Sequence, residues 1–351
     1  MLTSDQIELQ YAPISKPVVW VVESAYTGEL HARIGLAKRL GFGYELIPIP
    51  SGTIENYAKS LQHKFSDEVQ GCSALLIITG TGEETTAEIA DLRFFFDERL
   101  FTLFLASILP DDLPPRLNEY DLIASPQLVG DNIITLTGVP HTLCRAHLAK
   151  AYWQHARYFQ ALPKPIIGLL IGGNTRYCNG FNEAHANQFA ARVATIAATL
   201  EACLVISNSR RTPATAFSAL LAGLSGVEYH AFDWQDTPLD FYHGLLAHAD
   251  MFIVTGDSLS MCSEAAFTGK PVLVDLSEQA TEPCHREIIG KLIEYGAAKP
   301  LTAHYQPWDY VPPDPTGTIA QAVLAKLNRL QQFGDSHKYS GLNALRTIRA
   351  D

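Results

Sequence analysis

The chain of 351 residues is about twice the length of a usual single domain, so two domains of roughly 150 to 180 residues are expected. Hydrophobic residues make up 47% and charged residues 18%, which is enough apolar material for folded cores and too little charge for disorder. The net charge of −11 excludes nucleic acid as the main partner, because binding nucleic acid needs a broad basic face. An anionic small ligand is not excluded, since one or two well-placed arginines suffice to bind it.

The six cysteines are scattered, with no C-x-x-C motif and no metal-like spacing of His and Cys. We therefore expect buried thiols in a reducing cytoplasm, rather than a disulfide scaffold or a zinc site. The first residues lack the basic and apolar regions of a secretory signal. The apolar stretch at 100–109 is far shorter than the ~20 residues that span a bilayer. A cytoplasmic protein, peripheral at the inner face of a membrane at most, is expected.

Short apolar runs alternate with longer amphipathic stretches, which predicts βαβ repetition and parallel sheets. In the first half, strands are expected at 16–22, 74–78, 100–105, 122–124 and 133–137, and helices at 31–40, 85–93 and 143–160. The rigid sequence Pro163-Lys-Pro165 then predicts a domain boundary.

The second half restarts the same alternation. Strands are expected at 166–171, 203–207, 251–255 and 271–275, and helices at 182–201, 213–224, 258–268 and 316–332. The predicted organisation is therefore α/β, with doubly wound domains at 1–163 and 164–332 and a cleft between them. Such sheets bind ligands at the carboxyl ends of their strands. The tail at 333–351 is predicted to be an amphipathic helix that packs back on the body, with contact to a membrane surface as the alternative.

The sharpest candidate site follows the strand at 251–255, where Ser258 or Ser260 begins a helix. The free N–H groups and the dipole of a helix start attract anions, and serine hydroxyls donate to phosphate oxygens. Glu264 lies one turn after Ser260 on the same side, where a carboxylate can accept hydrogen bonds from both hydroxyls of a ribose. The alternative is that Asp257 and the serines only cap the helix and Glu264 is an exposed acid.

A second strand end carries Arg210 and Arg211, followed by Thr212-Pro213 as the expected N-cap and first residue of a helix. An adjacent arginine pair at this edge suits a diphosphate. The alternative, a solvated basic pair, is disfavoured because a helix N-terminus repels cations. A third strand end carries the turn Gly172-Gly173-Asn174, which lets the backbone approach a phosphate or sugar. The G-x-G-x-x-G motif is absent, so a nicotinamide site is not supported.

In the first half, the loop after the first strand holds Glu29 and His31 at the equivalent edge. Both are candidate general bases that would face the cleft if the domains oppose each other. The alternative for His31 is an ordinary residue at the start of a helix.

These segments resemble a known family. The sequence S-N-S-R-R-T-P at 207–213 and the sequence T-G-D-S-L-S-M-C-S-E-A at 255–265 are similar to the mitochondrial fission (elongated-mitochondria) protein family, which comprises plant proteins and many bacterial glycosyltransferase-like proteins. L-I-G-G-N at 170–174 and W-D-Y-V-P at 308–312 also match. The similarity spans residues 18–325, apart from the loop at 24–31, where the family's His is displaced by two positions and Glu29 takes its place.

The resemblance implies a GT-B glycosyltransferase fold of two Rossmann-like domains. The implied reaction is metal-independent, needs no cofactor, and transfers a sugar from a nucleotide-diphosphate sugar to a glycan or lipid acceptor. Glu264 would hold the ribose, Glu29 or His31 would deprotonate the acceptor with inversion at the anomeric carbon, and the diphosphate would contact Arg210, Arg211, Ser258 and Ser260. Two alternatives are a non-catalytic scaffold that acts through protein partners and a nucleotide-sugar epimerase or hydrolase.

Overall fold

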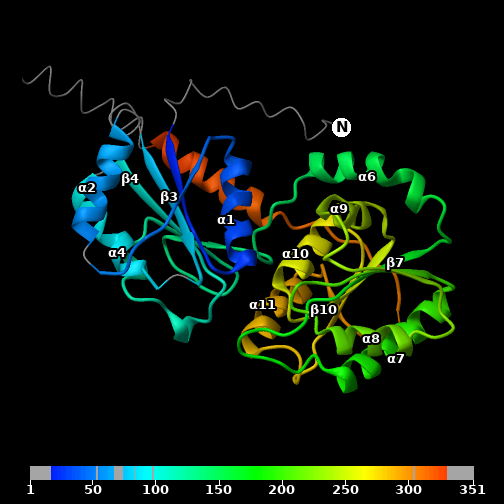
Figure 1. Ribbon diagram of the computed structural model, residues 1–351. Coiled ribbons are helices and arrows are strands. Elements are labelled where there is room, and N and C mark those ends of the chain that lie inside the picture. Colours follow the sequence, from blue (N-terminus) through cyan, green and yellow to red (C-terminus); the bar gives the residue numbers. More distant parts are fainter. Residues whose placement is uncertain are drawn as a thin grey trace, which may run out of the picture. The chain divides into compact units, whose positions relative to one another are not determined.

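The computed structural model describes residues 17–52, 54–66, 74–82, 84–96, 99–302 and 305–329, which form two compact α/β units (Figure 1). The first unit comprises the described residues up to Leu105, Leu113–Ala124 and those from Thr318 onward. The second comprises Ala106–Asp112 and Ser125–Gly317. The division predicted at residues 163 and 164 comes from the sequence alone and remains a prediction.

The first sheet has the strand order β2-β1-β3-β4-β5-β6, and every pairing from β2 to β5 is parallel. Its strands are β1 (Val18–Val22), β2 (Glu45–Ile47), β3 (Leu75–Gly80), β4 (Leu100–Leu105), β5 (Leu122–Ser125) and β6 (Ile133–Thr135). The helices are α1 (Thr27–Leu40), α2 (Ile54–Lys64), α4 (Thr86–Asp91) and α5 (Arg93–Phe96). Short 3₁₀ turns lie at Pro110–Asp112 and Leu117–Glu119. The strand order reverses direction between β1 and β3, which makes this the topological switch point of the sheet.

The second sheet has the order β12-β11-β10-β7-β8-β9 with parallel pairing throughout. Its strands are β7 (Ile166–Leu170), β8 (Cys203–Ser207), β9 (Tyr229–Phe232), β10 (Met251–Thr255), β11 (Val272–Asp275) and β12 (Lys299–Pro300). The helices are α6 (Arg145–Phe159), α7 (Glu183–Leu200), α8 (Ala214–Gly223), α9 (Leu239–His248), α10 (Leu259–Thr268) and α11 (Pro283–Glu294). Here the switch point lies between β7 and β10.

Alternation along the strands divides the second core into two layers. On β7, Ile166 and Leu170 pack with α6, α9, α10 and α11 on one face of the sheet. Ile167 and Leu169 point the other way and pack with α7 and α8. Because both faces are covered there, the central strands β7, β8 and β10 are almost entirely apolar instead of alternating with polar residues.

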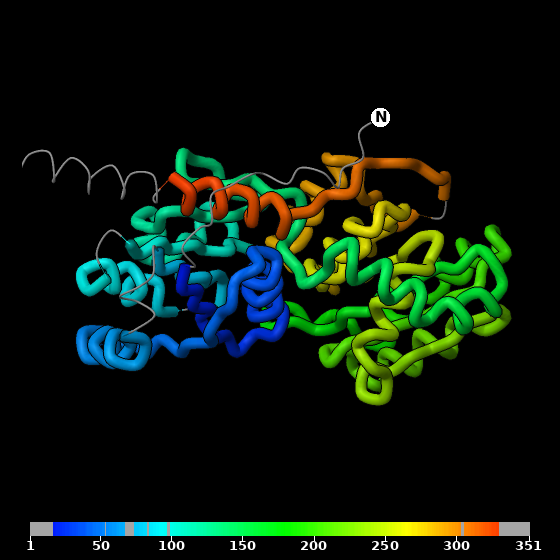
Figure 2. The backbone as a smooth tube through the Cα atoms, turned by 90° about the horizontal axis from the view of Figure 1, so that it is seen from above, coloured from blue at the N-terminus to red at the C-terminus, as the bar shows by residue number. Residues whose placement is uncertain are grey.

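Residues 315–329 form a helix that leaves the second unit and ends in the first (Figure 2). There Lys326 Nζ donates to the carbonyl oxygen of Asp121 at 2.5 Å and lies 5.5 Å from the centroid of the Phe101 ring. The C-terminal part of the chain therefore completes the unit that the N-terminal part begins. The tail helix predicted at 333–351 lies outside the described residues.

Several predicted elements have different bounds in the structure. The helix expected at 31–40 already starts at Thr27, so Glu29 lies on a helix and the loop predicted to hold it was wrong. The helix expected at 85–93 is divided into α4 and α5 around Leu92. The helix expected to start at Pro213 starts at Ala214, so the predicted assignment of Thr212 as N-cap was wrong. Pro213 occupies the N-cap position, with an extended backbone, because the Thr212 hydroxyl is used in a tertiary hydrogen bond described below. Within the described residues, no helix is long and apolar enough to cross a membrane.

A buried arginine holds together the loops at the switch point of the first sheet. Arg33 on α1 is fully buried, and its Nη1 donates to the carbonyl oxygens of Val22 at 2.7 Å and Glu23 at 3.2 Å, where β1 ends. Its Nη2 donates to the carbonyl oxygens of Gly80 and Thr81, both at 3.0 Å, where β3 ends. One planar guanidinium therefore joins the ends of two neighbouring strands.

We expect Arg33→Lys to destabilise the first unit by about 2–4 kcal/mol, because a single ammonium nitrogen cannot reach both pairs of carbonyl groups. Hydrogen exchange of peptides from β1 and β3 measures this loss. Lys38→Met is the control, because Lys38 is exposed on the same helix and its loss should cost less than about 0.5 kcal/mol. Equal exchange in the two variants would contradict the role assigned to Arg33.

Candidate functional site

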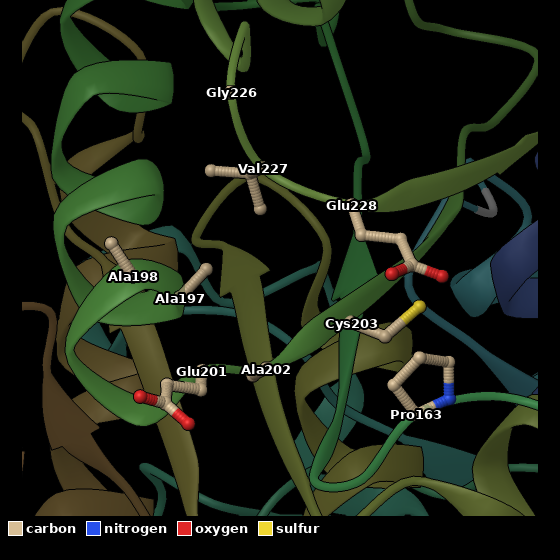
Figure 3. A pocket seen from close by; sticks show the side chains of 9 residues that line it. All are labelled: Pro163, Ala197, Ala198, Glu201, Ala202, Cys203, Gly226, Val227 and Glu228. Carbon is tan, nitrogen blue, oxygen red and sulfur yellow. The ribbon is translucent and has the colours of Figure 1, made fainter.

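Two pockets of the second unit lie at the amino ends of β8 and β9. The first has a volume of about 170 Å³ and includes Cys203 and Glu228 in its lining (Figure 3). The second has a volume of about 660 Å³ and includes Glu228 and His230. None of the residues predicted to bind a ligand lines either pocket. Those residues lie at the opposite, carboxyl edge of the second sheet, where the strand order places a ligand site.

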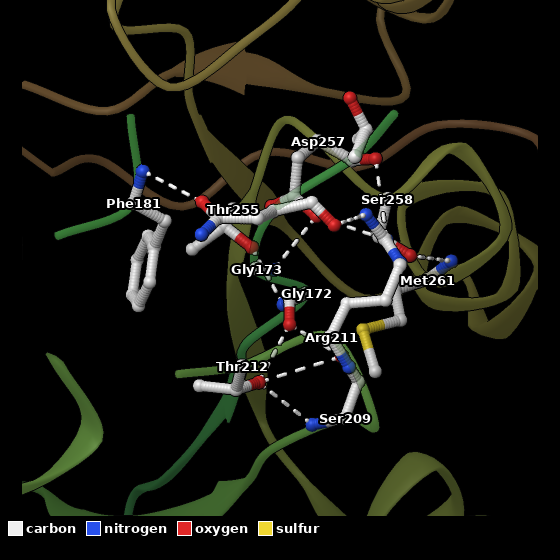
Figure 4. A network of polar contacts seen from close by, with 12 residues as sticks. Gly172, Gly173, Phe181, Ser209, Arg211, Thr212, Thr255, Asp257, Ser258 and Met261 are labelled. Atoms are coloured by element: carbon white, nitrogen blue, oxygen red, sulfur yellow. Dashed lines mark hydrogen bonds and ion pairs between the residues drawn. The ribbon is translucent and has the colours of Figure 1, made fainter. Parts of the chain in front are cut away.

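At that edge, the glycine turn after β7 is joined to the end of β10 (Figure 4). Gly172 N donates to Thr255 Oγ1 at 2.8 Å, and Gly173 N donates to Asp257 Oδ2 at 2.7 Å. A Cβ on Gly172 would lie 2.1 Å from Asp257 Oδ2, and Gly173 has φ +135°. Both positions therefore require glycine, one for the close approach and one for the backbone conformation.

The segment after β8 closes the other side of the turn. Thr212 Oγ1 donates to the carbonyl oxygen of Gly172 at 2.6 Å, and Ser209 Oγ donates to the same oxygen. Asn174 N donates to the carbonyl oxygen of Arg211 at 3.0 Å. Three strand ends far apart in the sequence are thus held together by hydrogen bonds that involve short side chains.

Arg211 and Asp257 form an ion pair at the centre of this network. Arg211 Nη2 lies 2.9 Å from Asp257 Oδ2, with the Asp257 side chain 1% exposed and the Arg211 side chain 33% exposed. Arg211 Nη1 also donates to the carbonyl oxygen of Asn174 at 3.1 Å. Burial raises the pKa of Asp257 to about 6, against the opposing effects of Arg211 and the hydrogen bonds it accepts.

The two adjacent arginines are placed differently. Arg211 is fixed by Asp257 and Asn174, whereas the Arg210 side chain is exposed. The two arginines occupy a turn that Thr212 N closes by donating to the carbonyl oxygen of Ser209 at 3.0 Å, and within it only Arg211 is directed into the network. The structure therefore brings Gly172, Gly173, Asn174 and Arg211 together and leaves Arg210 at the surface.

Helix α10 starts at the same place. Ser258 is its N-cap and accepts a hydrogen bond from Met261 N at 3.4 Å, as the capping alternative predicted. Ser260 and Glu264 follow on the half-buried side of the helix. Glu264 Oε2 accepts a hydrogen bond from the Tyr242 hydroxyl at 2.7 Å. Burial raises the pKa of Glu264 to about 7, so this carboxyl group titrates near neutral pH instead of being an ordinary exposed acid.

His285 on α11 is a residue of this site that the sequence analysis missed. Burial and the Arg211 charge lower the pKa of His285, while Glu282 and the backbone of Asp257 act in the opposite direction. The neighbouring Glu282 accepts a hydrogen bond from Thr175 Oγ1, which links α11 to the glycine turn. Pro283 is the first residue of α11 and is the sequence signal that could have indicated this helix.

Glu29 and His31 belong to the first unit, where Glu29 lies on the first turn of α1 and His31 on the second. Burial raises the pKa of Glu29 to about 7, although the positive charge of Arg33 opposes this. Desolvation and Lys38 lower the pKa of His31, whose side chain is exposed. Residues two apart on a helix do not share a face, so the pair offers two separate candidate bases rather than one acid–base couple.

Comparison with known proteins places the chain in a family. The family model described as mitochondrial fission ELM1 matches residues 27–327. The mitochondrial fission protein ELM1 of Arabidopsis thaliana is 26% identical over 72% of the chain, and the match spans 64% of that relative's length. An uncharacterised protein of Rickettsia prowazekii is 25% identical, with 80% of the chain and 89% of the relative covered.

Solved structures with the same fold include two enzymes that act on nucleotide sugars. The UDP-GlcNAc 2-epimerase of Methanocaldococcus jannaschii superimposes with a TM-score of 0.57 at 13% identity, covering 89% of the chain and 99% of the epimerase. The UDP-GlcNAc 2-epimerase of Neisseria meningitidis, bound to UDP-GlcNAc, has a TM-score of 0.50 at 13% identity, covering 90% of the chain and 94% of the epimerase. At this identity the likeness establishes the fold, which is α/β with two Rossmann-like units of the GT-B type. From the family match across residues 27–327, the chain belongs to the mitochondrial fission ELM1 family.

Proposed function

We propose that the second unit binds a nucleotide-diphosphate sugar at the β7/β10 switch point and that the protein transfers the sugar to an acceptor hydroxyl. The observation that carries this proposal is Arg211, fixed by the buried Asp257 between the glycine turn and the start of α10. A charged fork held in one orientation loses little freedom when it binds a diphosphate. The acceptor in this proposal is a glycan or lipid.

The charge of the diphosphate would be balanced by two features of this edge. Asp257 pairs with Arg211 Nη2, and the arginine side chain stays 33% exposed at the surface of the sheet edge. The first-turn amides of α10 lack helical carbonyl partners and lie at the positive end of the helix dipole. The exposed Arg210 and the half-buried Ser260 would complete the contacts to the diphosphate. We propose that these groups stabilise the leaving diphosphate without a metal or other cofactor.

Glu264 would hold the ribose. In the structure its Oε2 accepts one hydrogen bond from the Tyr242 hydroxyl. The carboxylate can therefore accept further hydrogen bonds from sugar hydroxyls. A carboxyl group with a pKa raised to about 7 by burial costs stability, and such groups cluster at functional sites. In the first unit, the Glu29 pKa of about 7 suits a general base for the acceptor, with His31 as the alternative. A direct attack assisted by one base predicts inversion at the anomeric carbon.

Titration calorimetry with UDP, GDP and ADP tests donor binding. We expect one nucleotide per chain and about a 10- to 100-fold loss of affinity in Arg211→Ala, since this change removes charge-assisted hydrogen bonds. Glu264→Ala should weaken both UDP and uridine, whereas Arg211→Ala should weaken UDP alone because uridine lacks phosphates. Binding of none of these nucleotides, or binding indifferent to both changes, would refute the donor site.

Incubation of a panel of nucleotide sugars with and without acceptors tests the reaction. Transfer requires that nucleotide release depends on the acceptor. Release or epimerisation without an acceptor would instead assign the chain to the hydrolase or epimerase class. Nucleotide binding with no turnover of any donor would favour a scaffold that acts through protein partners.

We expect Arg211→Ala to destabilise the second unit by about 3 kcal/mol, because it leaves the carboxylate of Asp257 buried and unpaired. The double variant Arg211→Ala/Asp257→Asn should recover part of this loss. Arg210→Ala is the matched control, since the exposed neighbour should cost less than about 0.5 kcal/mol. Thermal unfolding measures the stability of all three variants. Equal losses of stability in Arg210→Ala and Arg211→Ala would contradict the ion pair with the buried Asp257.

The raised pKa of Glu264 predicts a pH-dependent stability. The folded chain retains this proton up to a pH of about 7, whereas the unfolded chain releases it near its ordinary value of 4.5. Its contribution to stability is therefore present below pH 4.5 and lost as the pH rises to about 7. Glu264→Gln should raise stability at pH 8 by about 1–2 kcal/mol and have little effect at pH 5. Glu287→Gln, at an exposed position of α11, should show no such pH dependence in the thermal midpoint.

A further inference from the structure

Three side chains that can bind metals meet at the amino ends of β8 and β9, away from the proposed nucleotide site. Cys203 is the first residue of β8, Glu228 directly precedes β9, and His230 is its second residue. The register pairs Leu204 with Tyr229 and Val205 with His230, which sets Cys203 beside Glu228. Because side chains alternate along a strand, Cys203, Glu228 and His230 lie on the same face of the sheet.

The three side chains direct their ligand atoms toward one another. One ligand atom each from Cys203, Glu228 and His230 lie within 4.8 Å of one another. Figure 3 shows the Cys203 sulfur and the Glu228 carboxylate pointing into the same space beside Pro163. Among the described residues, Glu228 forms no ion pair with Lys or Arg, so a negative group faces the sulfur without a protein cation to balance it.

A fourth residue fixes the orientation of the imidazole. The Tyr158 hydroxyl on α6 lies 3.0 Å from His230 Nδ1. With Nδ1 occupied in this way, Nε2 is the ring nitrogen left to bind a metal. A partner on the second ring nitrogen is the usual arrangement around metal-bound histidines, because it sets both the tautomer and the direction of the ring.

The geometry points to a zinc site formed by Cys203, Glu228 and His230, with Tyr158 as a positioning residue. A thiolate, an imidazole and a carboxylate are the ligands that Zn²⁺ takes in proteins, and the sulfur disfavours Mg²⁺ and Ca²⁺. Tetrahedral Zn²⁺ needs its ligand atoms about 3.5 Å apart. The exposed Glu228 side chain is free to rotate and would bring its carboxylate closer to the other two ligand atoms when the metal binds. Water from the 660 Å³ pocket that Glu228 and His230 line would occupy the fourth position.

The consequence of zinc binding would be structural. β9 is the edge strand of the second sheet and pairs only with β8, according to the strand order. A metal bound by Cys203 on β8 and by two residues of the β9 segment would cross-link this edge. The nucleotide site lies at the other end of the strands, roughly 16 Å away for a five-residue strand. We therefore expect zinc to change the stability of the second unit more than its affinity for nucleotides.

Cobalt substitution of the untagged full-length chain, after removal of metals with a chelator, tests the site. One equivalent of Co²⁺ should give a thiolate-to-cobalt charge-transfer band together with the strong visible bands of tetrahedral coordination. Zn²⁺ should displace it and, at a 100-fold excess over its Kd, raise the thermal midpoint by about 5–10 °C. Cys203→Ser should abolish the charge-transfer band, while Cys144→Ser, which changes a half-buried thiol outside the proposed site, should retain it.

Two further variants keep the test independent of folding. Glu228→Gln alters an exposed side chain and should lower zinc affinity about 100-fold without unfolding the chain. Tyr158→Phe should lower affinity about 10-fold while leaving the cobalt spectrum tetrahedral, as expected for a residue that acts through His230. A spectrum without thiolate character, or affinity unchanged by both Cys203→Ser and Glu228→Gln, would overturn the site. Nucleotide titrations in the presence and absence of zinc separate this result from the donor-site test.

Discussion

The buried ion pair between Arg211 and Asp257 is the interaction on which the candidate site depends. Asp257 is almost fully buried, and it also accepts a hydrogen bond from the amide of Gly173. One carboxylate therefore fixes both the glycine turn and the arginine. Burying such a carboxylate is costly unless it is paired and hydrogen-bonded. The cost is offset only while the strand ends of β7, β8 and β10 remain in register, which couples the integrity of the site to that of the sheet.

In both units an arginine joins neighbouring strand ends, but its hydrogen-bond partners differ. At the switch point of the first sheet, Arg33 is buried and its charge is spread over four backbone carbonyl groups. At that of the second sheet, Arg211 is paired with a carboxylate and remains partly exposed. Arg33 is fully buried with both terminal nitrogens bonded to carbonyl groups inside the protein, whereas the Arg211 side chain is 33% exposed. Only the second arrangement is suited to bind an anionic ligand through its arginine.

Sequence reasoning could group the residues of the candidate site in the second unit because they follow strand ends that are apolar and easily recognised. Gly172, Arg211 and Ser258 are separated by long stretches of sequence, yet parallel pairing brings their strand ends to one edge. It could not separate Arg210 from Arg211, since only the packing of Asp257 decides which arginine turns inward. In the second unit β9, α9, α11 and β12 were missed, and in the first β2 and α2. The sequence Tyr-His-Ala-Phe of β9 is partly exposed and lacks a continuous apolar pattern, and with α11 the analysis also missed His285.

The same limitation explains why a metal site was not expected. Cys203 and His230 are 27 positions apart and match no ligand spacing along the chain, but they lie on neighbouring strands. Their proximity is a property of strand register, which the sequence does not reveal once β9 goes unrecognised. Polar chemistry therefore occurs at both ends of β8, and the two ends differ in what holds them. The carboxyl end is closed by hydrogen bonds within the protein, whereas at the amino end sulfur, imidazole and carboxylate face one another and a cation would join them.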